Sequence, residues 1–585
     1  MKNSSNSQWG RTCRLAYVVA LPLLLCLAES AGVQAQTLTT LHNFNGTDGA
    51  FPSSQLTSQL AKSHVVQHSN GNFYGTTPAG GAFTYGTVFQ VTAAGAETTI
   101  YSFCSLGGSA CTDGSTPQGA LVLGSNGNLY GTTFSGGANN DGTVFVITPA
   151  GSLTTLHSFS GADGANPVGA LALGRNGNLY GTTFVGGANN DGTVFQITPG
   201  GSLTTLHTFS GADGINPGGD LVLSSGNGNF YGTTYAGGNS NSAGTLFQMT
   251  PSGSLTTLYT FCSSTNCNDG SAPNVPLTLD SFGDVYGTTS TNGANAGGTL
   301  FELTWWGGFH TIYHFCAKTN CTDGAQPLGG PVVGKDFNIY GTTTTGGAGG
   351  SGTVYQFTPW HQLTTLYNFC SKANCTDGAN PETALTQGAD GNFYGTTSVG
   401  GTFNFGTVWN LATVPASGHS CNGVYSANFL GNIYVSSGQT CEFTDGATIL
   451  GNVYLSGGSL ILTNATVLGN VEIQGGTYAL GPSLTIASKL EVQNVPSGTT
   501  QNTVCGVNVF GSVYYNGNGS PAEIGSSSSS CPGNTIGGDL EINSNTAFVQ
   551  VFDNSVRDAL TCSSNSNITG ASNTARRKPG QCSSF

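Results

Sequence analysis

The stretch GNLYGTTFSGGANNDGTVFVITPAGSLTTLHSFSGADGANP, residues 127–167, recurs in varied form through the first two thirds of the chain. Its tetrapeptide Tyr-Gly-Thr-Thr returns at steps of 56, 50, 51, 55, 54 and 54 residues. The seven copies begin at Tyr74, Tyr130, Tyr180, Tyr231, Tyr286, Tyr340 and Tyr394. A repeat of this length indicates an array of similar supersecondary units, so it governs the fold prediction.

Each unit carries four short strand candidates. In one unit they are 171–173, 178–183, 192–198 and 202–209, all rich in β-branched or aromatic residues and bounded by Gly, Asn, Pro or Asp. Four strands in about 50 residues are typical of a β-propeller blade, whereas the coils of a β-solenoid are usually about 20 to 30 residues long. The sequence therefore predicts an all-β, seven-bladed propeller.

The phase of the repeat predicts how the ring closes. The array begins with a fourth strand, 38–44, that has no first three strands before it, and it ends with a third strand near 406–411. Pairing these two would complete the seventh blade and remove an open sheet edge. We therefore expect the N-terminal strand to close the propeller.

The spelling of the motif resembles the GloVer-type tandem-repeat family of bacterial secreted proteins, over about residues 37–412. The resemblance implies export and a C-terminal region for anchoring or assembly. It supplies no established catalytic residues to carry over.

Composition excludes several classes of protein. Only 7% of the 585 residues are charged and 91 are Gly, which argues against long repeated helices. The 31 Phe and 21 Tyr argue against disorder. The net charge is -14 with only 13 Lys plus Arg, so the chain lacks the basic footprint of a nucleic-acid binder.

The N-terminus has the pattern of a signal peptide, residues 1–35. Lys2, Arg11 and Arg14 precede the apolar run 15–28, and 33–35 offers a small-x-small cleavage pattern. An uncleaved anchor is the alternative, but the run is short for a membrane span and no later stretch is apolar enough. We expect an extracellular or cell-surface protein with no transmembrane segment after cleavage.

Cysteine spacing agrees with export. Two cysteines lie in the signal, and the other fourteen form neighbouring pairs. The pairs are Cys104 with Cys111, Cys262 with Cys267, Cys316 with Cys321, Cys370 with Cys375, Cys421 with Cys441, Cys505 with Cys531, and Cys562 with Cys582. An even number in an exported chain predicts disulfides. Zinc is the rival for the three C-x4-C pairs, but no flanking His or Cys completes four ligands, so no metal or other cofactor is predicted.

The long loops of the predicted blades share one face and carry a recurring Asp-Gly-x-x-Pro. Its aspartates are Asp48, Asp113, Asp163, Asp213, Asp269, Asp323 and Asp377. One interpretation is a ring of ligand-binding carboxylates. The other is a turn, in which Asp accepts backbone hydrogen bonds, Gly supplies positive φ and Pro fixes the next strand. Identical use in every unit favours the turn. The sequence shows no extra carboxylate pair of the kind a glycosidase uses.

Tryptophans break the symmetry of the opposite face. The usual Pro-x-Gly turn becomes Trp305-Trp306-Gly307 in one unit and Pro359-Trp360-His361 in the next. These three tryptophans are candidates for stacking on sugar rings, against the plainer interpretation of packing at the edge of the C-terminal region. His42, His157 and His207 share a repeat position with four tyrosines, which indicates a half-buried strand position rather than a base or ligand.

A shorter repeat begins after residue 415. Gly-Asn-aliphatic markers start at Gly431, Gly451 and Gly469, with degenerate echoes at Gly511 and Gly538. Steps of 20 and 18 residues suit coils of a β-helix. The region weakly resembles bactofilin-like and other short-coil solenoids, some of which polymerise. We expect residues 36–415 to form the propeller and 416–585 a separate β-helix-like domain, with disulfides that cap or staple its coils.

Two functions remain open at this point. The first is a secreted or cell-surface, non-enzymatic protein whose propeller binds glycans or surface proteins and whose C-terminal domain attaches or self-assembles. The alternative is an extracellular enzyme acting on glycans or polysaccharide, which rests on fold analogy alone.

Overall fold

The computed structural model describes residues 36–585 apart from 53–63, 108–110, 225, 274, 281–282, 306, 335–337, 359–360, 413–418, 427–428, 431, 499 and 527–531. The predicted signal peptide lies outside the described residues. The chain divides into two compact units, with the boundary between residues 413 and 414. Within the described part of the chain, none of the helices has the length and apolar character needed to cross a membrane.

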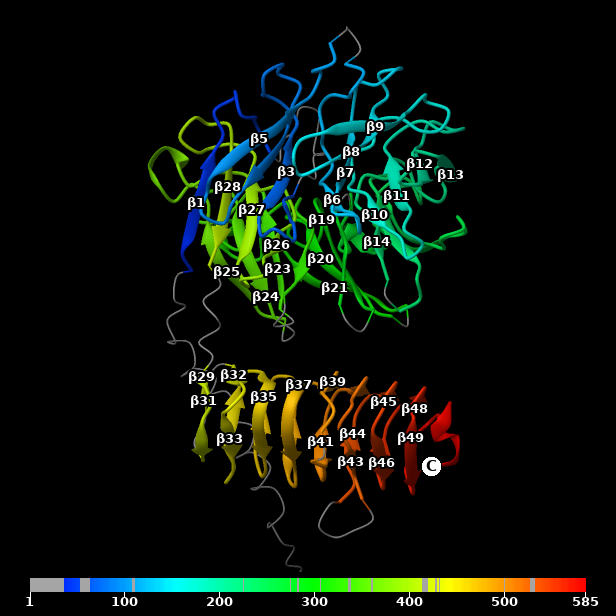
Figure 1. Ribbon diagram of the computed structural model, residues 1–585, viewed down its shortest axis with the longest axis vertical. Helices are drawn as coiled ribbons and strands as arrows, with labels where there is room; N and C mark the ends of the chain where they lie inside the picture. Colours follow the sequence, from blue (N-terminus) through cyan, green and yellow to red (C-terminus); the bar gives the residue numbers. More distant parts are fainter. Residues whose placement is uncertain are drawn as a thin grey trace, which may run out of the picture. The chain divides into compact units, whose positions relative to one another are not determined.

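In the described residues, the first unit consists of seven four-stranded antiparallel sheets, which are the blades of a propeller (Figure 1). The first strands are β2 (Val66–Gln67), β6 (Val122–Leu123), β10 (Ala172–Leu173), β14 (Val222–Leu223), β18 (Thr278–Leu279), β22 (Val332–Val333) and β26 (Thr386–Gln387). The second strands are β3 (Phe73–Thr77), β7 (Leu129–Thr133), β11 (Leu179–Thr183), β15 (Phe230–Thr234), β19 (Val285–Thr289), β23 (Ile339–Thr343) and β27 (Phe393–Thr397). The third strands are β4 (Thr87–Val91), β8 (Thr143–Ile147), β12 (Thr193–Ile197), β16 (Thr245–Met249), β20 (Thr299–Leu303), β24 (Thr353–Phe357) and β28 (Thr407–Leu411).

The fourth, outermost strands are one residue longer than the second and third strands. They are β5 (Glu97–Ser102), β9 (Leu153–Ser158), β13 (Leu203–Thr208), β17 (Leu255–Thr260), β21 (Phe309–His314), β25 (Leu363–Asn368) and β1 (Leu38–Asn43). We number the blades 1 to 7 in this order, so that blade 1 holds β2–β5 and blade 7 holds β26–β28 with β1. The prediction of seven blades is confirmed.

The N-terminal strand closes the ring as predicted. Strand β1 pairs antiparallel with β28, with Leu38 opposite Leu411 and Asn43 opposite Thr407. Beyond the strands, the Phe44 amide donates to the Gly406 carbonyl over 3.1 Å. Blade 7 therefore takes its outer strand from one end of the array and its other three from the far end.

The repeated Tyr-Gly-Thr-Thr forms the buried second strand. In blade 3 a Cβ on Gly181 would lie 2.6 Å from the ring of Phe195, so only glycine lets the ring pack there. The buried hydroxyls of Thr183 and Thr193 pair with each other over 2.8 Å. Phe195 also meets Phe159 of the previous blade edge to face, 5.2 Å between ring centroids. The glycine of the motif thus makes room for the ring of the third strand, and that ring forms the contact between blades.

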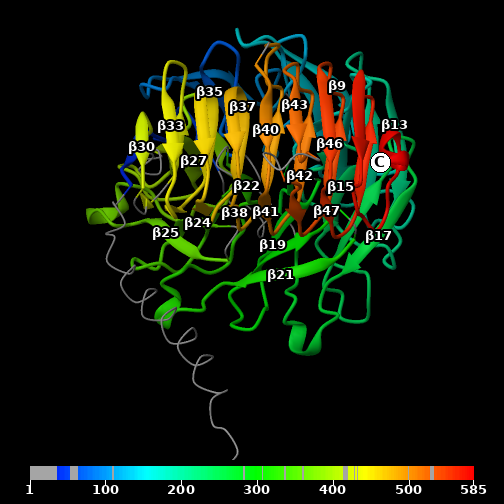
Figure 2. The same ribbon diagram turned by 90° about the horizontal axis from the view of Figure 1, so that it is seen from below.

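The second unit is a parallel β-solenoid whose coils place strands on three faces. The first face has β29 (His419–Ser420), β32 (Ile433–Val435), β35 (Val453–Leu462), β37 (Val471–Leu480), β39 (Leu490–Gln493), β42 (Val513–Asn516), β45 (Leu540–Asn543) and β48 (Leu560–Ser563). The second has β30 (Gly423–Tyr425), β33 (Thr440–Phe443), the later halves of β35 and β37, β40 (Asn502–Val504), β43 (Ala522–Ile524), β46 (Phe548–Phe552) and β49 (Asn567–Ala571) (Figure 2). The third has β31 (Phe429–Leu430), β34 (Thr448–Leu450), β36 (Thr466–Val467), β38 (Leu484–Ile486), β41 (Val507–Val509), β44 (Thr535–Ile536) and β47 (Ser555–Val556).

Aliphatic side chains fill the solenoid, and asparagines stack between its coils. The Asn452 amide donates to the Asn432 side chain and the Asn470 amide to the Asn452 side chain, over 2.9 and 2.8 Å. The Gly-Asn markers of the sequence are therefore the rungs of an asparagine ladder. A deeper ladder of Asn518, Asn545 and Asn565 is buried. The echoes at Gly511 and Gly538 precede strands in the same register, and the coil that begins at Leu490 has no marker.

Six of the seven predicted disulfides are formed between described cysteines. In the propeller they are Cys104–Cys111, Cys262–Cys267, Cys316–Cys321 and Cys370–Cys375, and in the solenoid Cys421–Cys441 and Cys562–Cys582. Cys505 is also disulfide-bonded, while its predicted partner Cys531 lies outside the described residues. The short 3-10 helices η1 (Thr265–Cys267), η2 (Thr319–Cys321) and η3 (Ala373–Cys375) carry three of the bonds, and η4 (Gln581–Ser584) carries Cys582 at the end of the solenoid.

Candidate functional site

The seven aspartates of the loop repeat share one structural partner. Each carboxylate contacts the His or Tyr near the end of the outer strand of the same blade, over 2.7–3.1 Å. The pairs are His42–Asp48, Tyr101–Asp113, His157–Asp163, His207–Asp213, Tyr259–Asp269, Tyr313–Asp323 and Tyr367–Asp377. The sequence interpretation placed the His and Tyr on a half-buried strand but missed their pairing with aspartate.

Whether the partner of the aspartate is Tyr or His depends on whether the loop has a disulfide. Loops with a disulfide use Tyr, and their aspartates are buried, whereas loops without one use His, and their aspartates are half-buried. Burial alone would raise the pKa of Asp377, but hydrogen bonds from Tyr367, Ser371 and backbone amides outweigh it and lower the pKa. Burial and the nearby carboxylate raise the pKa of Tyr367 to about 12. These contacts suit the turn interpretation, and a ligand-binding role for the seven aspartates stays a prediction.

Of the three candidate tryptophans, Trp305 is described. The residue is 53% exposed, and its backbone amide donates to the Asp284 carboxylate over 2.8 Å. Trp306 and Trp360 lie outside the described residues. Stacking of sugars on this group stays a prediction.

Neighbouring blades meet on the long-loop face through a repeated residue pair. One residue precedes the third strand, and the other lies three residues after the loop aspartate and donates its amide to the first residue's carbonyl over 2.7–2.9 Å. The pairs are Tyr85/Thr116, Asp141/Asn166, Asp191/Asn216, Ala243/Ala272, Gly297/Gln326, Ser351/Asn380 and Phe405/Phe51. We call these the junction pairs. Their side chains differ from one blade boundary to the next.

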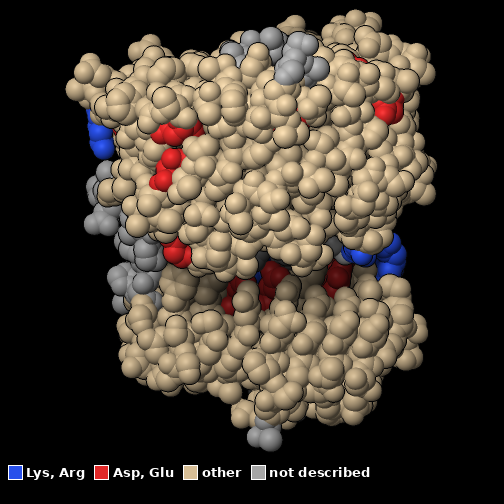
Figure 3. Space-filling view, turned by 45° about the horizontal axis from the view of Figure 1, so that its top comes forward, with Lys and Arg blue, Asp and Glu red and all other residues tan. Residues whose placement is uncertain are grey.

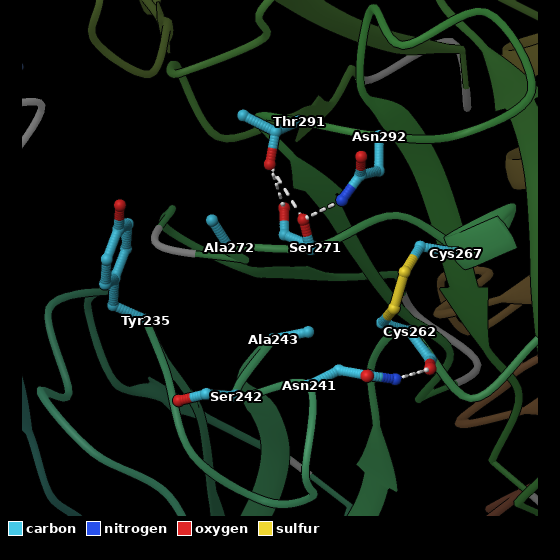
Figure 4. Close-up of a pocket in the computed structure, with 10 residues that line it drawn as sticks. All are labelled: Tyr235, Asn241, Ser242, Ala243, Cys262, Cys267, Ser271, Ala272, Thr291 and Asn292. Carbon is cyan, nitrogen blue, oxygen red and sulfur yellow. Dashed lines mark hydrogen bonds between the residues drawn. A yellow bond between two sulfur atoms is a disulfide. The ribbon is translucent and has the colours of Figure 1, made fainter.

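The junction pair that consists of two alanines lies at a pocket between blades 4 and 5. At the preceding junction, Asn216 extends its side chain to the Phe184 carbonyl over 2.8 Å. Ala243 and Ala272 have no such side chains, and a cavity of about 420 Å³ lies there (Figure 4). Ligand pockets in proteins have a typical volume of about 300–1,000 Å³.

The described residues that line the pocket carry no charge, and they offer both polar and apolar groups. Its other lining residues are Tyr235, Asn241, Ser242, Cys262, Cys267, Ser271, Thr291 and Asn292. Ser271 binds the Thr291 hydroxyl over 2.8 Å and accepts from the Asn292 amide over 2.6 Å, which fixes one wall. The Cys262–Cys267 disulfide and the bond from Asn241 to the Cys262 carbonyl fix another. Tyr235 is 37% exposed, and its ring forms the apolar side (Figure 4).

The junction between blades 7 and 1 carries aromatic side chains instead. Phe51 and Phe405 meet edge to face at 5.5 Å. Phe83, Tyr85 and Phe403 on the adjoining loops are each about half exposed. We call these five residues, which lie on the loops of blades 7 and 1, the aromatic patch. At the matching positions blades 2 and 3 carry Asn and Asp, namely Asn139, Asp141, Asn166, Asn189, Asp191 and Asn216.

Charged groups are sparse on the face of the molecule that Figure 3 shows. Two acids come just before first strands, where strands of neighbouring blades such as β10 and β14 contact each other. Asp220 accepts the Ala170 amide over 2.6 Å, and Glu382 accepts the Ser398 hydroxyl over 3.4 Å. They belong to blades 4 and 7, so they are not a pair within one blade or between adjacent blades.

Comparison with known proteins decides the family. The model of the Gloeobacter/Verrucomicrobia repeat matches residues 30–172, 60–268 and 262–459, which together are more than half of the chain. The chain belongs to the Gloeobacter/Verrucomicrobia repeat family. The resemblance drawn from the repeat is thus confirmed.

Two solved structures show a low level of similarity to this chain. This member of the Gloeobacter/Verrucomicrobia repeat family is 14% identical to virginiamycin B lyase from Staphylococcus aureus, with a TM-score of 0.41 over 64% of this chain and 99% of that one. It is 16% identical to a putative 6-phosphogluconolactonase from Bacteroides uniformis, with a TM-score of 0.38 over 57% and 89%. Likeness at this level carries no argument about activity. A search of curated proteins found no match.

Proposed function

We propose that this protein is an extracellular, non-enzymatic glycan-binding protein, with the propeller as the binding platform and the solenoid for attachment or assembly. The disulfides indicate an oxidising, extracellular environment. The observation that carries the proposal is the uncharged pocket at Ala243 and Ala272. One aromatic ring faced by hydroxyl and amide groups matches a sugar, which has an apolar ring face and polar edges.

The ligand class follows from the charge. None of the described residues that line the pocket is Lys, Arg, Asp or Glu, and the chain as a whole has a net charge of -14. An anionic ligand would be repelled by the protein and would find no cation in the pocket. A neutral glycan is therefore the proposed ligand. The aromatic patch between blades 7 and 1 offers a second stacking surface for a longer polysaccharide.

An array of neutral and charged glycans, probed with the full chain, tests the proposal. We expect binding to neutral glycans that is lost in Ala272→Asn. This variant places in the pocket an Asn side chain like that of Asn216 at the preceding junction. Ala272 has a φ of +54°, close to the +57° of Asn216, and Asn tolerates this region well, so the variant should fold. Thr116→Asn makes the same change at the junction between blades 1 and 2 and should bind as the wild type does.

A hydrolysis assay on the bound glycans distinguishes the alternative. If the wild type releases new reducing ends and a folded variant does not, the protein is an enzyme and the proposal is overturned. Binding that survives Ala272→Asn would place the site elsewhere.

A further inference from the structure

One His–Asp pair differs from the other two by a third residue that adds a second carboxylate. Beside His42 and Asp48 lies Glu97, and one ligand atom from each of the three residues lies within 4.8 Å of the others. The His42 Nε2 is 3.1 Å from the Asp48 Oδ2, and all three side chains are half-buried. The group therefore joins imidazole nitrogen and two carboxylates, which are metal ligands, in one small volume.

Glu97 is the exception among the seven outer strands. It is the first residue of β5, and the corresponding residues are Leu38, Leu153, Leu203, Leu255, Phe309 and Leu363. At that position in blade 5, Phe309 stacks on Tyr259 of blade 4 with 3.6 Å between ring centroids. Glu97 instead faces the His42–Asp48 pair of blade 7. A packing residue has thus been replaced by a carboxylate at one junction only, the one that joins the closing strand to blade 1.

Neighbouring groups hold the two carboxylates in place. The Asn45 amide donates to the Asp48 Oδ1 over 2.9 Å, and its side chain donates to the Oδ2 over 2.8 Å. The Thr99 hydroxyl lies 3.1 Å from both the Glu97 Oε1 and the Asp48 carbonyl, so it links the two residues. Hydrogen bonds that orient ligating carboxylates are typical of metal sites.

We propose that His42, Asp48 and Glu97 bind one divalent transition-metal ion such as Zn²⁺. Ligand atoms about 2.1 Å from a tetrahedral ion lie about 3.4 Å apart, close to the His42–Asp48 distance. Three protein ligands leave a fourth position for water. Because His42 and Asp48 belong to β1 and the segment after it, the ion would fix the closing strand to blade 1.

The other two His–Asp pairs provide matched comparisons. His157–Asp163 and His207–Asp213 have the same repeat geometry, at 2.8 and 2.7 Å, but the outer strands of the next blades begin with Leu203 and Leu255. A His with a single carboxylate is a weaker site than a His with two. These two pairs should therefore not bind the ion at concentrations that saturate the proposed site.

Isothermal titration of the full, metal-stripped chain with Zn²⁺ tests the proposal. We expect one ion per chain, and affinity at least about 100-fold weaker in Glu97→Leu, since even the loss of an outer hydrogen-bond partner costs 10–100-fold. Leu is the residue most blades carry there, so this variant should fold. His157→Ala should leave the stoichiometry unchanged, and Leu203→Glu should add a second ion beside His157 and Asp163.

A second readout does not depend on titration heat. Zn²⁺ should raise the unfolding temperature of the wild type and of His157→Ala, but not of Glu97→Leu. A folded wild type that binds no stoichiometric Zn²⁺ would overturn the proposal. So would a Glu97→Leu variant that binds Zn²⁺ as tightly as the wild type.

Discussion

Replacing Asp377 by Asn separates the two interpretations of the aspartate repeat. The buried carboxylate accepts the Tyr367 hydroxyl over 2.7 Å, the Ser371 amide and hydroxyl over 2.9 and 2.8 Å, and the Lys372 amide over 3.2 Å. An Asn has one acceptor oxygen, so its amide nitrogen must face at least one of these donors. A buried donor left without a partner costs about 1–3 kcal/mol. The remaining hydrogen bonds become weaker because their acceptor is no longer charged. We expect a total loss of about 2–4 kcal/mol in the free energy of unfolding.

The matched control is Asp213→Asn. Asp213 accepts His207 over 2.7 Å and the Ser210 amide over 2.9 Å, but its side chain is 23% exposed, so water can replace a lost partner. We expect a loss of about 1 kcal/mol or less there. Denaturant unfolding, followed through the propeller transition, measures both variants. If neither variant loses more than about 0.5 kcal/mol in the free energy of unfolding, the aspartates do not stabilise the fold. That result would favour the interpretation of the aspartates as a ring of ligand-binding carboxylates.

Three further predictions concern pH, the solenoid and ring closure. The pKa values of Asp269 and Asp377 are lowered in the folded state, so the stabilisation by these carboxylates is fully present above the ordinary carboxyl pKa of about 4. It is lost as the pH falls through the lower folded pKa values, and the stability of the wild type should therefore fall more steeply below about pH 4. A stability that does not change with pH in this range would contradict the lowered pKa values. Asn545→Ala should lower solenoid stability by about 3 kcal/mol, measured by calorimetry, because Asn518, Asn565 and the Tyr515 carbonyl all lose a buried partner; a loss under 1 kcal/mol would show that the ladder is not a source of stability. Deleting residues 36–44 should expose the β28 edge and promote association, measured by light scattering, and a monomer of unchanged stability would contradict closure by β1.

The fold was predictable because its signals are periodic. Glycines and threonines that allow a ring to pack beneath the second strand must recur in every blade, so Gly181 and its counterparts appear at steps of 50 to 56 residues. The strand phase then predicts closure without any knowledge of contacts. The solenoid was partly predictable, because what each coil needs is inward aliphatic residues. The Gly-Asn marker is dispensable, and the coil at Leu490 has none.

The site residues were harder to predict because they depend on contacts between blades. The His or Tyr partner lies 6 residues before its aspartate in blades without a loop disulfide and 10 or 12 in the others, which hides a fixed spacing. The pocket arises from side chains that Ala243 and Ala272 lack, and these lie in different repeats. In the sequence, Glu97 differs from the Leu or Phe that the other outer strands have at the same repeat position. Only the structure places it beside His42.

Calorimetric titration of the full chain with an oligosaccharide of the neutral glycan that the array selects tests the central claim most directly. The account predicts one site per chain, with affinity at least about tenfold weaker in Tyr235→Ala and in Ala272→Asn, since a lost aromatic contact or a filled pocket costs over 1.4 kcal/mol. Thr116→Asn and Phe403→Ala should bind a short oligosaccharide as the wild type does. Unchanged affinity in Ala272→Asn, or cleavage of the oligosaccharide during the titration, would contradict the account.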